Sequence, residues 1–266
     1  MIGGGEKQRN RKSSLSLSEI MILAISSHQS GFRNMKTWYK NYILRHRVRE
    51  FPSLVSYTRF VELLSSALVP LCYYLNSLKG KDTEIAYVDS TPIKVCHNRR
   101  ISRHRVFDGL AERGKHSMGW FYGFKLHLIV NEKGEMLAFH VTPGNIDDRS
   151  PVVAMSKQIS GKLFGDRGYI SQKLEEALSQ QGINFMTTLK KNMKPRVRSQ
   201  LDQLLLRKRS LIETINDQLK NISQIEHSRH RSPKNFMVNI FAGLIAYAKQ
   251  PKKPSLQFHT RQELIL

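Results

Sequence analysis

Helical periodicity dominates the first third of the chain. Ser16 and Glu19 have the spacing of a capping box, in which Ser16 caps a helix and Glu19 reaches back to the backbone of Ser16. Apolar residues follow this box until Gly31, and two or three further helical segments follow it. We therefore predict a small all-helical N-terminal domain over residues 14–79, preceded by a flexible basic arm over residues 1–13.

After Gly80 the pattern changes to that of β-strands. In residues 121–130, apolar side chains alternate with Lys125 and His127, as in a strand that buries one face. The polar residues 131–134, which end in glycine, are typical of a hairpin turn. The predicted strands cover residues 84–88, 121–130, 136–141, 163–165 and 183–189.

Helices are predicted between and after these strands. Asp147 or Asp148 is expected to cap the first of them, a role that suits these two residues better than metal binding. The predicted helices cover residues 147–159, 171–181, 201–225 and 237–248. Strands and helices in this order favour an α/β domain, with a sheet covered by helices on both faces. We place this domain at residues 80–250 and a C-terminal tail at residues 251–266.

The net charge of the chain indicates the class of molecule that it binds. The 266 residues include 43 Lys and Arg against 21 Asp and Glu, a formal net charge of +22. A compact domain this basic repels itself unless a polyanion neutralises it, and nucleic acid is the first candidate. A ribosomal protein and a protein bound to an anionic membrane surface are the alternatives.

Other features of the sequence indicate where the protein is located in the cell. Cys72 and Cys96 are far apart and lack the spacing of a zinc site or a disulfide framework. The apolar runs are shorter than the roughly 20 residues that a membrane span needs, and residues 1–12 do not resemble a secretory signal. We therefore expect a cytoplasmic protein that associates with the nucleoid when bound to DNA, and no membrane partner.

Three carboxylates are candidates for chemistry. Asp89 and Asp166 each follow a short apolar strand and precede a turn, and ligand sites in open sheets collect at strand ends. Glu213 shares one face of the predicted helix 201–225 with Arg209. Each residue alone has an ordinary structural interpretation: Asp89 and Asp166 as turn or cap residues, and Glu213 as the partner of Arg209 in a surface ion pair.

Together, the three carboxylates predict a site for hard divalent cations. Mg²⁺ prefers oxygen ligands and keeps several waters, so a few carboxylates suffice to hold it. Two such ions can stabilise both the attacking and the leaving oxygen of a phosphoryl transfer. Basic residues that could hold a DNA backbone surround the predicted site: Lys190, Lys191, Lys194, Arg196, Arg198, Arg207, Lys208 and Arg209.

Several motifs occur in an order that resembles a known family. The segments are IAYVDSTPI, FYGFKLHLIVNEKGE, TPGNIDD, LFGDRGY and RKRSLIETINDQLK. In this order they resemble the DDE transposases of bacterial insertion sequences, in particular the IS982 family, with IS4- and IS5-type enzymes as relatives. The resemblance covers roughly residues 14–250. It implies an RNase H-like catalytic domain with a mixed sheet flanked by helices.

The resemblance also assigns roles to individual residues. It implies a catalytic, metal-binding triad of Asp89, Asp166 and Glu213 that uses Mg²⁺ or Mn²⁺, as two ions. IS4-type enzymes carry a Tyr-x2-Arg-x3-Glu-x6-Lys signature, whose last three positions match Arg209, Glu213 and Lys220, while Leu206 stands in place of the Tyr. By the resemblance, the Arg and Lys contact DNA near the cleaved end. The chain is then expected to act as a homodimer on terminal inverted repeats and target DNA.

Three other functions remain open from the sequence. An RNase H-like nuclease would cut DNA without joining it. A catalytically inactive or truncated copy would act only as a DNA-binding protein. The resemblance raises this alternative, because members of the family usually have additional residues before the segment that matches Ser14. A basic ribosomal protein would have no metal-dependent activity and no use for carboxylates at strand ends.

Overall fold

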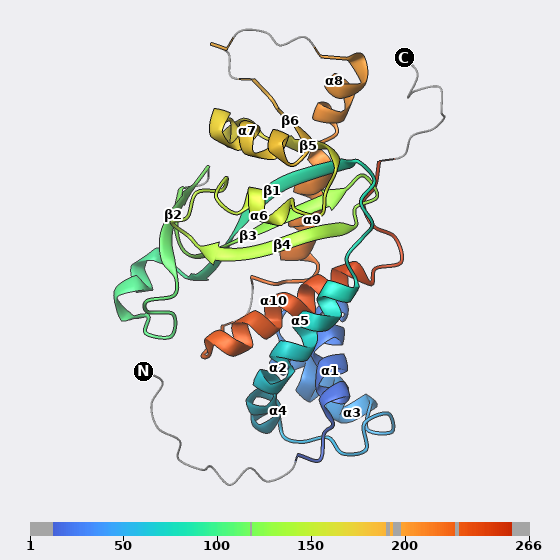
Figure 1. The fold of residues 1–266 in the computed structure, drawn as a ribbon. Helices are drawn as coiled ribbons and strands as arrows, with labels where there is room; N and C mark the ends of the chain where they lie inside the picture. The colour runs from blue at the N-terminus through green and yellow to red at the C-terminus, as the bar shows by residue number, and fades with distance from the viewer. Residues whose placement is uncertain (1–12, 118, 190–191, 194–197, 227–228, 257–266) are drawn as a thin grey trace.

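The computed structural model describes residues 13–117, 119–189, 192–193, 198–226 and 229–256, and Figure 1 gives their arrangement. A group of helices lies at one end and a sheet covered by further helices at the other. The predicted arm (residues 1–13) lies outside the described residues except for Ser13, as does most of the predicted tail, from residue 257 onward.

Residues 17–77 form a series of helices joined by loops, and the predicted capping box opens the first helix. Ser16 Oγ accepts a hydrogen bond from the Glu19 backbone N–H at 3.2 Å, and Glu19 Oε2 accepts one from Ser16 N–H at 2.7 Å. The helices are α1 (Leu17–Gln29), α2 (Met35–Trp38), the π-helical turn η1 (Tyr39–Ile43), α3 (Leu44–His46), α4 (Tyr57–Leu63), the 3₁₀ turn η2 (Leu64–Ala67) and α5 (Leu68–Ser77).

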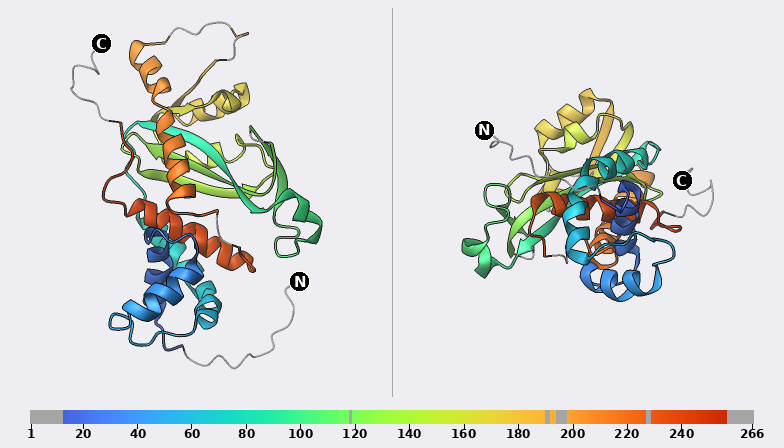
Figure 2. Two further views of the ribbon diagram at one scale, coloured as in Figure 1. Left: turned by 180° about the vertical axis from the view of Figure 1, so that it is seen from behind. Right: turned by 90° about the horizontal axis from the view of Figure 1, so that it is seen from below.

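These helices pack around a helix from the far end of the chain. Helix α10 (Pro233–Ala248) lies against α1 and α5, as Figures 1 and 2 show. Most of its residues are apolar, and Leu244 and Ile245 are fully buried in one core with Leu23 of α1 and Leu71 of α5. The first helices and α10 therefore share a hydrophobic core.

A six-stranded mixed sheet forms the other part of the described chain. Its order is β2-β3-β1-β5-β6, and β4 pairs with β3 as well. Strands β2, β3 and β4 continue the sheet from β1 in antiparallel pairs, whereas β5 and β6 run parallel to β1. The strands are β1 (Ile85–Cys96), β2 (Glu112–His116), β3 (Gly119–Asn131), β4 (Met136–Pro143), β5 (Gly161–Gly165) and β6 (Ile183–Thr187).

Helices cover both faces of this sheet. On one face, Val88 and Leu163 pack with α6 and α7, and on the other Tyr87 and Phe164 pack with α9 and α10. Figure 2 shows α9 crossing the second face. The helices are α6 (Val152–Met155), α7 (Gln172–Gln180), α8 (Gln200–Arg207) and α9 (Ser210–Asn221), with the 3₁₀ turns η3 (Asn98–Arg103) and η4 (Arg167–Tyr169). The prediction of an α/β fold with a mixed sheet flanked by helices is confirmed.

The strand predictions need two corrections. The first predicted strand does not end before Asp89 but continues through Pro92 to Cys96. Proline has no backbone N–H to donate to a neighbouring strand. Because β5 pairs only with Ile85–Tyr87, the β5 side of the strand at Pro92 has no partner that would need this hydrogen bond. Strand β2 was not predicted, because its residues are charged or glycine and depend on pairing with β3.

Two helix predictions also need correction. The helix predicted over residues 147–159 is only α6, because Asp147 accepts a hydrogen bond from Arg149 N–H at 2.9 Å and so closes a turn instead of capping a helix. Asp148 pairs with Lys125 at 2.9 Å. The helix predicted over residues 201–225 is divided into α8 and α9 by a turn at residues 208–209.

None of the helices within the described ranges combines the length and the apolar character that crossing a bilayer requires.

Candidate active site

The parallel pair β1 and β5 brings the first two carboxylates together. Tyr87 of β1 is paired with Phe164 of β5, and their rings stack with centroids 5.5 Å apart on the α9 face of the sheet. Side chains two residues apart on a strand point to the same face. Asp89 and Asp166 each follow this pair by two residues, so both carboxylates lie on the α9 side at the end of β5.

Asp89 is buried beside both acidic and basic side chains. The pKa of its carboxyl is raised from 3.8 to about 7, chiefly by burial and to a smaller extent by the nearby charges of Asp166 and Glu213. The Ser90 backbone N–H and the Arg209 guanidinium act in the opposite direction. Asp166 and Glu213 are therefore both close enough to influence Asp89.

Asp166 has a structural role beside its position at the site. Its Oδ1 accepts a hydrogen bond from Gly168 N–H at 2.7 Å and so caps the turn η4. That turn brings the Tyr169 side chain beneath the site, where burial and the nearby charges of Asp89 and Asp148 raise the pKa of its phenol. The cap interpretation of Asp166 and its position beside Asp89 are therefore compatible.

Glu213 lies on α9 and is paired with Arg209, one turn earlier. Its side chain is 53% exposed, whereas that of Arg209 is 18% exposed. This is the surface ion pair that the four-residue spacing also allows. Among the described residues, no group of three or more His, Cys, Asp and Glu side chains is already gathered in the arrangement of a metal site.

Asn216 connects α9 to Asp89, and the sequence analysis missed it. Its Nδ2 donates a hydrogen bond to Asp89 Oδ2 at 2.9 Å, across 127 residues of sequence. Asn216 is 6% exposed, and its Oδ1 is buried with no hydrogen-bond partner in the described part of the chain. The available signal was its position three residues after Glu213, which places both on neighbouring parts of one helix face.

Replacing Asn216 with Ala should move the pH dependence of activity. The amide hydrogen bond favours the ionised form of Asp89, so its loss should raise the pKa of Asp89 still further. If ionised Asp89 is needed for catalysis, the rising limb of the rate–pH profile should shift to higher pH in Asn216→Ala. A profile that keeps its wild-type position, with only a uniform loss of rate, would reduce Asn216 to a packing role.

The predicted DNA-contacting cations differ in their surroundings. Lys220 lies 3.5 Å from Glu226, and burial lowers the pKa of its amine. Arg198 Nη2 donates to the Thr187 carbonyl at the end of β6, at 2.6 Å. The remaining predicted contacts Lys190, Lys191, Lys194 and Arg196 lie outside the described residues. Leu206, at the position of the signature Tyr, is buried in the core.

Comparison with known families agrees with this geometry. The profile of the family described as "Transposase DDE domain" matches residues 79–233, more than half of the chain. The matched segment contains Asp89, Asp166 and Glu213 together with all six strands of the sheet. No curated protein matches the chain. Because the family profile matches more than half of the chain, including the whole mixed sheet, the chain belongs to the transposase DDE domain family.

Proposed function

We propose that this protein is a DNA transposase that cleaves insertion-sequence ends and transfers the freed 3′-hydroxyl strands to target DNA. Asp89, Asp166 and Glu213 are its catalytic residues in this proposal. The observation that carries it is the joint placement of two carboxylates by β1 and β5 beneath helix α9, which supplies the third. The family match supports the general activity. An RNase H-like arrangement of the catalytic domain is part of the same proposal.

The site is suited to divalent cations. Burial is the main reason why the pKa of Asp89 is raised to about 7, and a cation bound beside the carboxylate would offset this cost and favour its ionised form. Carboxylate oxygens are the ligands that Mg²⁺ and Mn²⁺ prefer. Asp89, Asp166 and Glu213 would hold two such ions, which when bound activate the attacking oxygen and neutralise charge on the phosphoryl group.

The protein's own residues prepare this site in three ways. Asn216 fixes the orientation of Asp89 by its hydrogen bond, and the η4 turn fixes Asp166 through Gly168. Glu213 is paired with Arg209 in this structure, and a Glu213 that turned toward a bound cation would release this partner. The released guanidinium is then available for a phosphate, which suits the DNA-contacting role proposed for Arg209.

The wider proposal concerns how DNA is held. Arg209, Lys220 and Arg198 would contact the backbone near the cleaved end, together with the basic residues at positions 190–196. The helical region of residues 14–79 would bind terminal inverted repeats, and a homodimer would hold two ends together. The net charge of +22 supports binding to both end and target DNA.

The direct test is a reaction of the purified protein with labelled DNA that carries the flanking element ends. Cleaved and joined products that need Mg²⁺ or Mn²⁺ and disappear in EDTA would support the transposase. Metal-dependent cutting with no joined product would favour the RNase H-like nuclease. Binding with neither reaction would favour an inactive copy that acts only as a DNA-binding protein.

Divalent cations should also stabilise the folded protein. A ligand that binds only the native state, at 100 times its Kd, adds about 2.7 kcal/mol, which corresponds to a rise of roughly 5 °C in Tm for a protein of this size. We expect Mn²⁺ to raise the Tm of the wild type by such an amount and that of Asp89→Asn by clearly less. Measurements at matched ionic strength provide the control. An equal rise in both proteins would place the stabilising cation elsewhere.

A further inference from the structure

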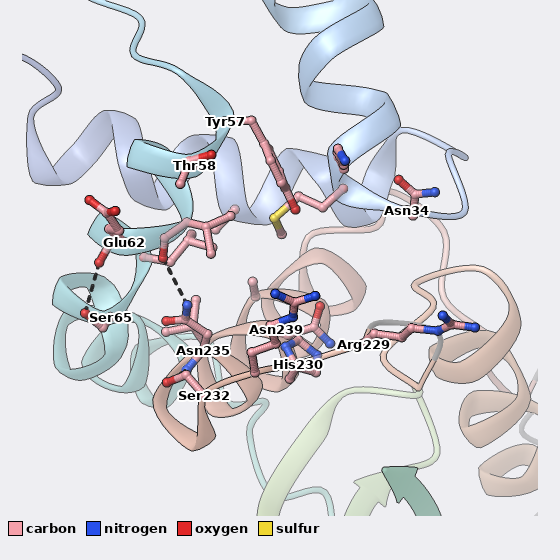
Figure 3. Close-up of a pocket in the computed structure, with 18 of the residues that line it drawn as sticks. Asn34, Tyr57, Thr58, Glu62, Ser65, Arg229, His230, Ser232, Asn235 and Asn239 are labelled. Carbon is pink, nitrogen blue, oxygen red and sulfur yellow. Dashed lines mark hydrogen bonds between the residues drawn. The ribbon is translucent and has the colours of Figure 1, made fainter. Parts of the chain in front are cut away.

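A second cleft, with charged residues on its walls, lies away from the three carboxylates. A cleft of about 1210 Å³ opens between the N-terminal helices and the beginning of α10. In Figure 3, Asn34, Tyr57 and Thr58 lie along one wall, and Arg229, His230 and Ser232 lie along the other. Asn235 connects the two walls, since its Nδ2 donates to the Val61 carbonyl of α4 at 3.0 Å.

Both walls of this cleft carry positive charge. Lys36 and Lys40, four residues apart, line the wall formed by α2 and η1, and Arg229 and Arg231 line the opposite wall. None of these four forms an ion pair within the described ranges. Like charges on facing walls repel one another, so an anion between them would stabilise the arrangement.

Negative charge in the lining does not offset these cations. Glu62 is the acidic residue among the described lining residues, and it is already paired with Arg59 at 2.9 Å. The N-terminus of α10, a helix of 16 residues capped by Ser232, also opens at the cleft and adds the positive end of its dipole. The cleft is therefore suited to a polyanion that passes between two cationic walls.

The cleft is connected to the candidate active site through the chain between α9 and α10. Glu226, in this connection, pairs with Lys220 of α9 at 3.5 Å and accepts the Lys94 backbone N–H of β1 at 3.0 Å. Arg229 and Arg231 follow a few residues later and line the cleft. His230 lines this cleft and also lines a smaller hollow together with Lys94 and Glu226, so the cleft lies next to the Lys94 end of β1.

We propose that this cleft binds the sugar–phosphate backbone of the DNA duplex whose end lies at the three carboxylates. Lys36, Lys40, Arg229 and Arg231 contact its phosphates from both sides, and the contact is independent of base sequence. The inference rests on the proposed transposase function and extends it, because it assigns a DNA contact to the connection after α9 as well as to the N-terminal helices.

The test is a fluorescence anisotropy titration of a labelled duplex at several salt concentrations, in EDTA so that no DNA is cut. The double variant Lys40→Gln/Arg231→Gln should bind about tenfold more weakly, and the slope of log K against log salt should fall by about 2. The loss should be similar for an element-end duplex and for an unrelated duplex. Both positions are exposed, so the fold should be retained, which a thermal melt verifies.

A matched control uses two exposed lysines beside the opposite face of the sheet. Lys157→Gln/Lys173→Gln, at α6 and on α7, removes the same charge and should leave affinity and salt slope close to wild type. An unchanged affinity in the cleft variant, or equal losses in cleft and control variants, would overturn the proposal. Asp89→Asn, assayed in parallel for cleavage, tests the transposase function separately, so a normal cleft variant beside an inactive Asp89→Asn would reject the cleft alone.

Discussion

Asp89→Asn is expected to lower the rate of metal-dependent DNA cleavage by at least about 100-fold, the usual effect of removing one group that stabilises transition-state charge. The substitution keeps the size of the side chain but removes its negative charge. The Asp89 carboxylate lies at the centre of the site: Asn216 donates a hydrogen bond to it, and the nearby charges of Asp166 and Glu213 raise its pKa. Single-turnover cleavage of a labelled duplex measures the effect.

The same substitution should stabilise the protein when no metal is present. The folded pKa of Asp89 is about 7, above the ordinary value of 3.8, so the folded state binds this proton more tightly than the unfolded state. Its favourable contribution is complete below about pH 4 and is lost as the pH rises toward about 7. In EDTA, Asp89→Asn should therefore melt above the wild type at pH 8, and by a smaller margin at pH 5.

A control for Asp89→Asn is available on α9. Asp217 accepts a hydrogen bond from Asn221 at 2.6 Å on an exposed part of the helix, so Asp217→Asn removes one negative charge near the site without touching Asp89. Cleavage by this variant should stay within about threefold of wild type, as expected for a surface change worth less than about 0.5 kcal/mol. Near-normal cleavage by Asp89→Asn would remove this residue from the proposed triad.

Glu213→Gln should also reduce cleavage by at least about 100-fold, and it should do so with almost no change in stability. The side chain is 53% exposed and makes one ion pair, with Arg209 at a spacing of four residues. Such pairs contribute only about 0.3–0.5 kcal/mol to a helix. If Glu213 served only in that ion pair, its replacement would leave cleavage nearly unchanged.

The matched control for Glu213→Gln is Glu50→Gln. Glu50 is 52% exposed and pairs with Arg47 at 2.7 Å, so the substitution breaks a comparable ion pair far along the sequence from the carboxylates. It should change neither Tm nor cleavage measurably. Cleavage rates of the two variants, normalised to active protein by DNA binding, separate a catalytic role from a structural one. Equal rates in both would show that the third carboxylate has been misassigned.

Local signals in the sequence predicted much of the fold. The capping box at Ser16 and Glu19, the hairpin turn after Asn131 and the helix capped by Ser171 all depend on residues close together in the chain. The helix predicted over residues 237–248 is found as part of α10. These features were predictable because backbone hydrogen bonding and side-chain periodicity over a few residues largely determine them.

Contacts between distant residues account for what the sequence did not predict. The extension of β1 past Pro92 depends on where its partner β5 ends, and the charged strand β2 depends on β3. The packing of α10 among the first helices joins the two ends of the chain. Short-range patterns contain no information about such partners, so tertiary pairing overrode the local signals.

In the candidate site, too, local signals were predictable from the sequence and contacts between distant residues were not. Asp89 and Asp166 were selected because each follows an apolar segment, and the register of β1 and β5 brings these two positions to one face. Asn216 was missed because its hydrogen bond to Asp89 spans 127 residues. The four-residue spacing of Arg209 and Glu213 predicts an ion pair as well as a catalytic role for Glu213. The ion pair is present in the structure, and Glu213 also lies close enough to Asp89 to raise the pKa of that carboxyl.

The most direct test of the central claim is a strand-transfer assay with a pre-cleaved element end, target DNA and Mg²⁺ or Mn²⁺. The account predicts joined products with wild-type protein, and none above background with Asp89→Asn, Asp166→Asn or Glu213→Gln, although all three variants still bind the DNA. Joined products that persist in any one of these variants, or that form equally well in EDTA, would contradict it.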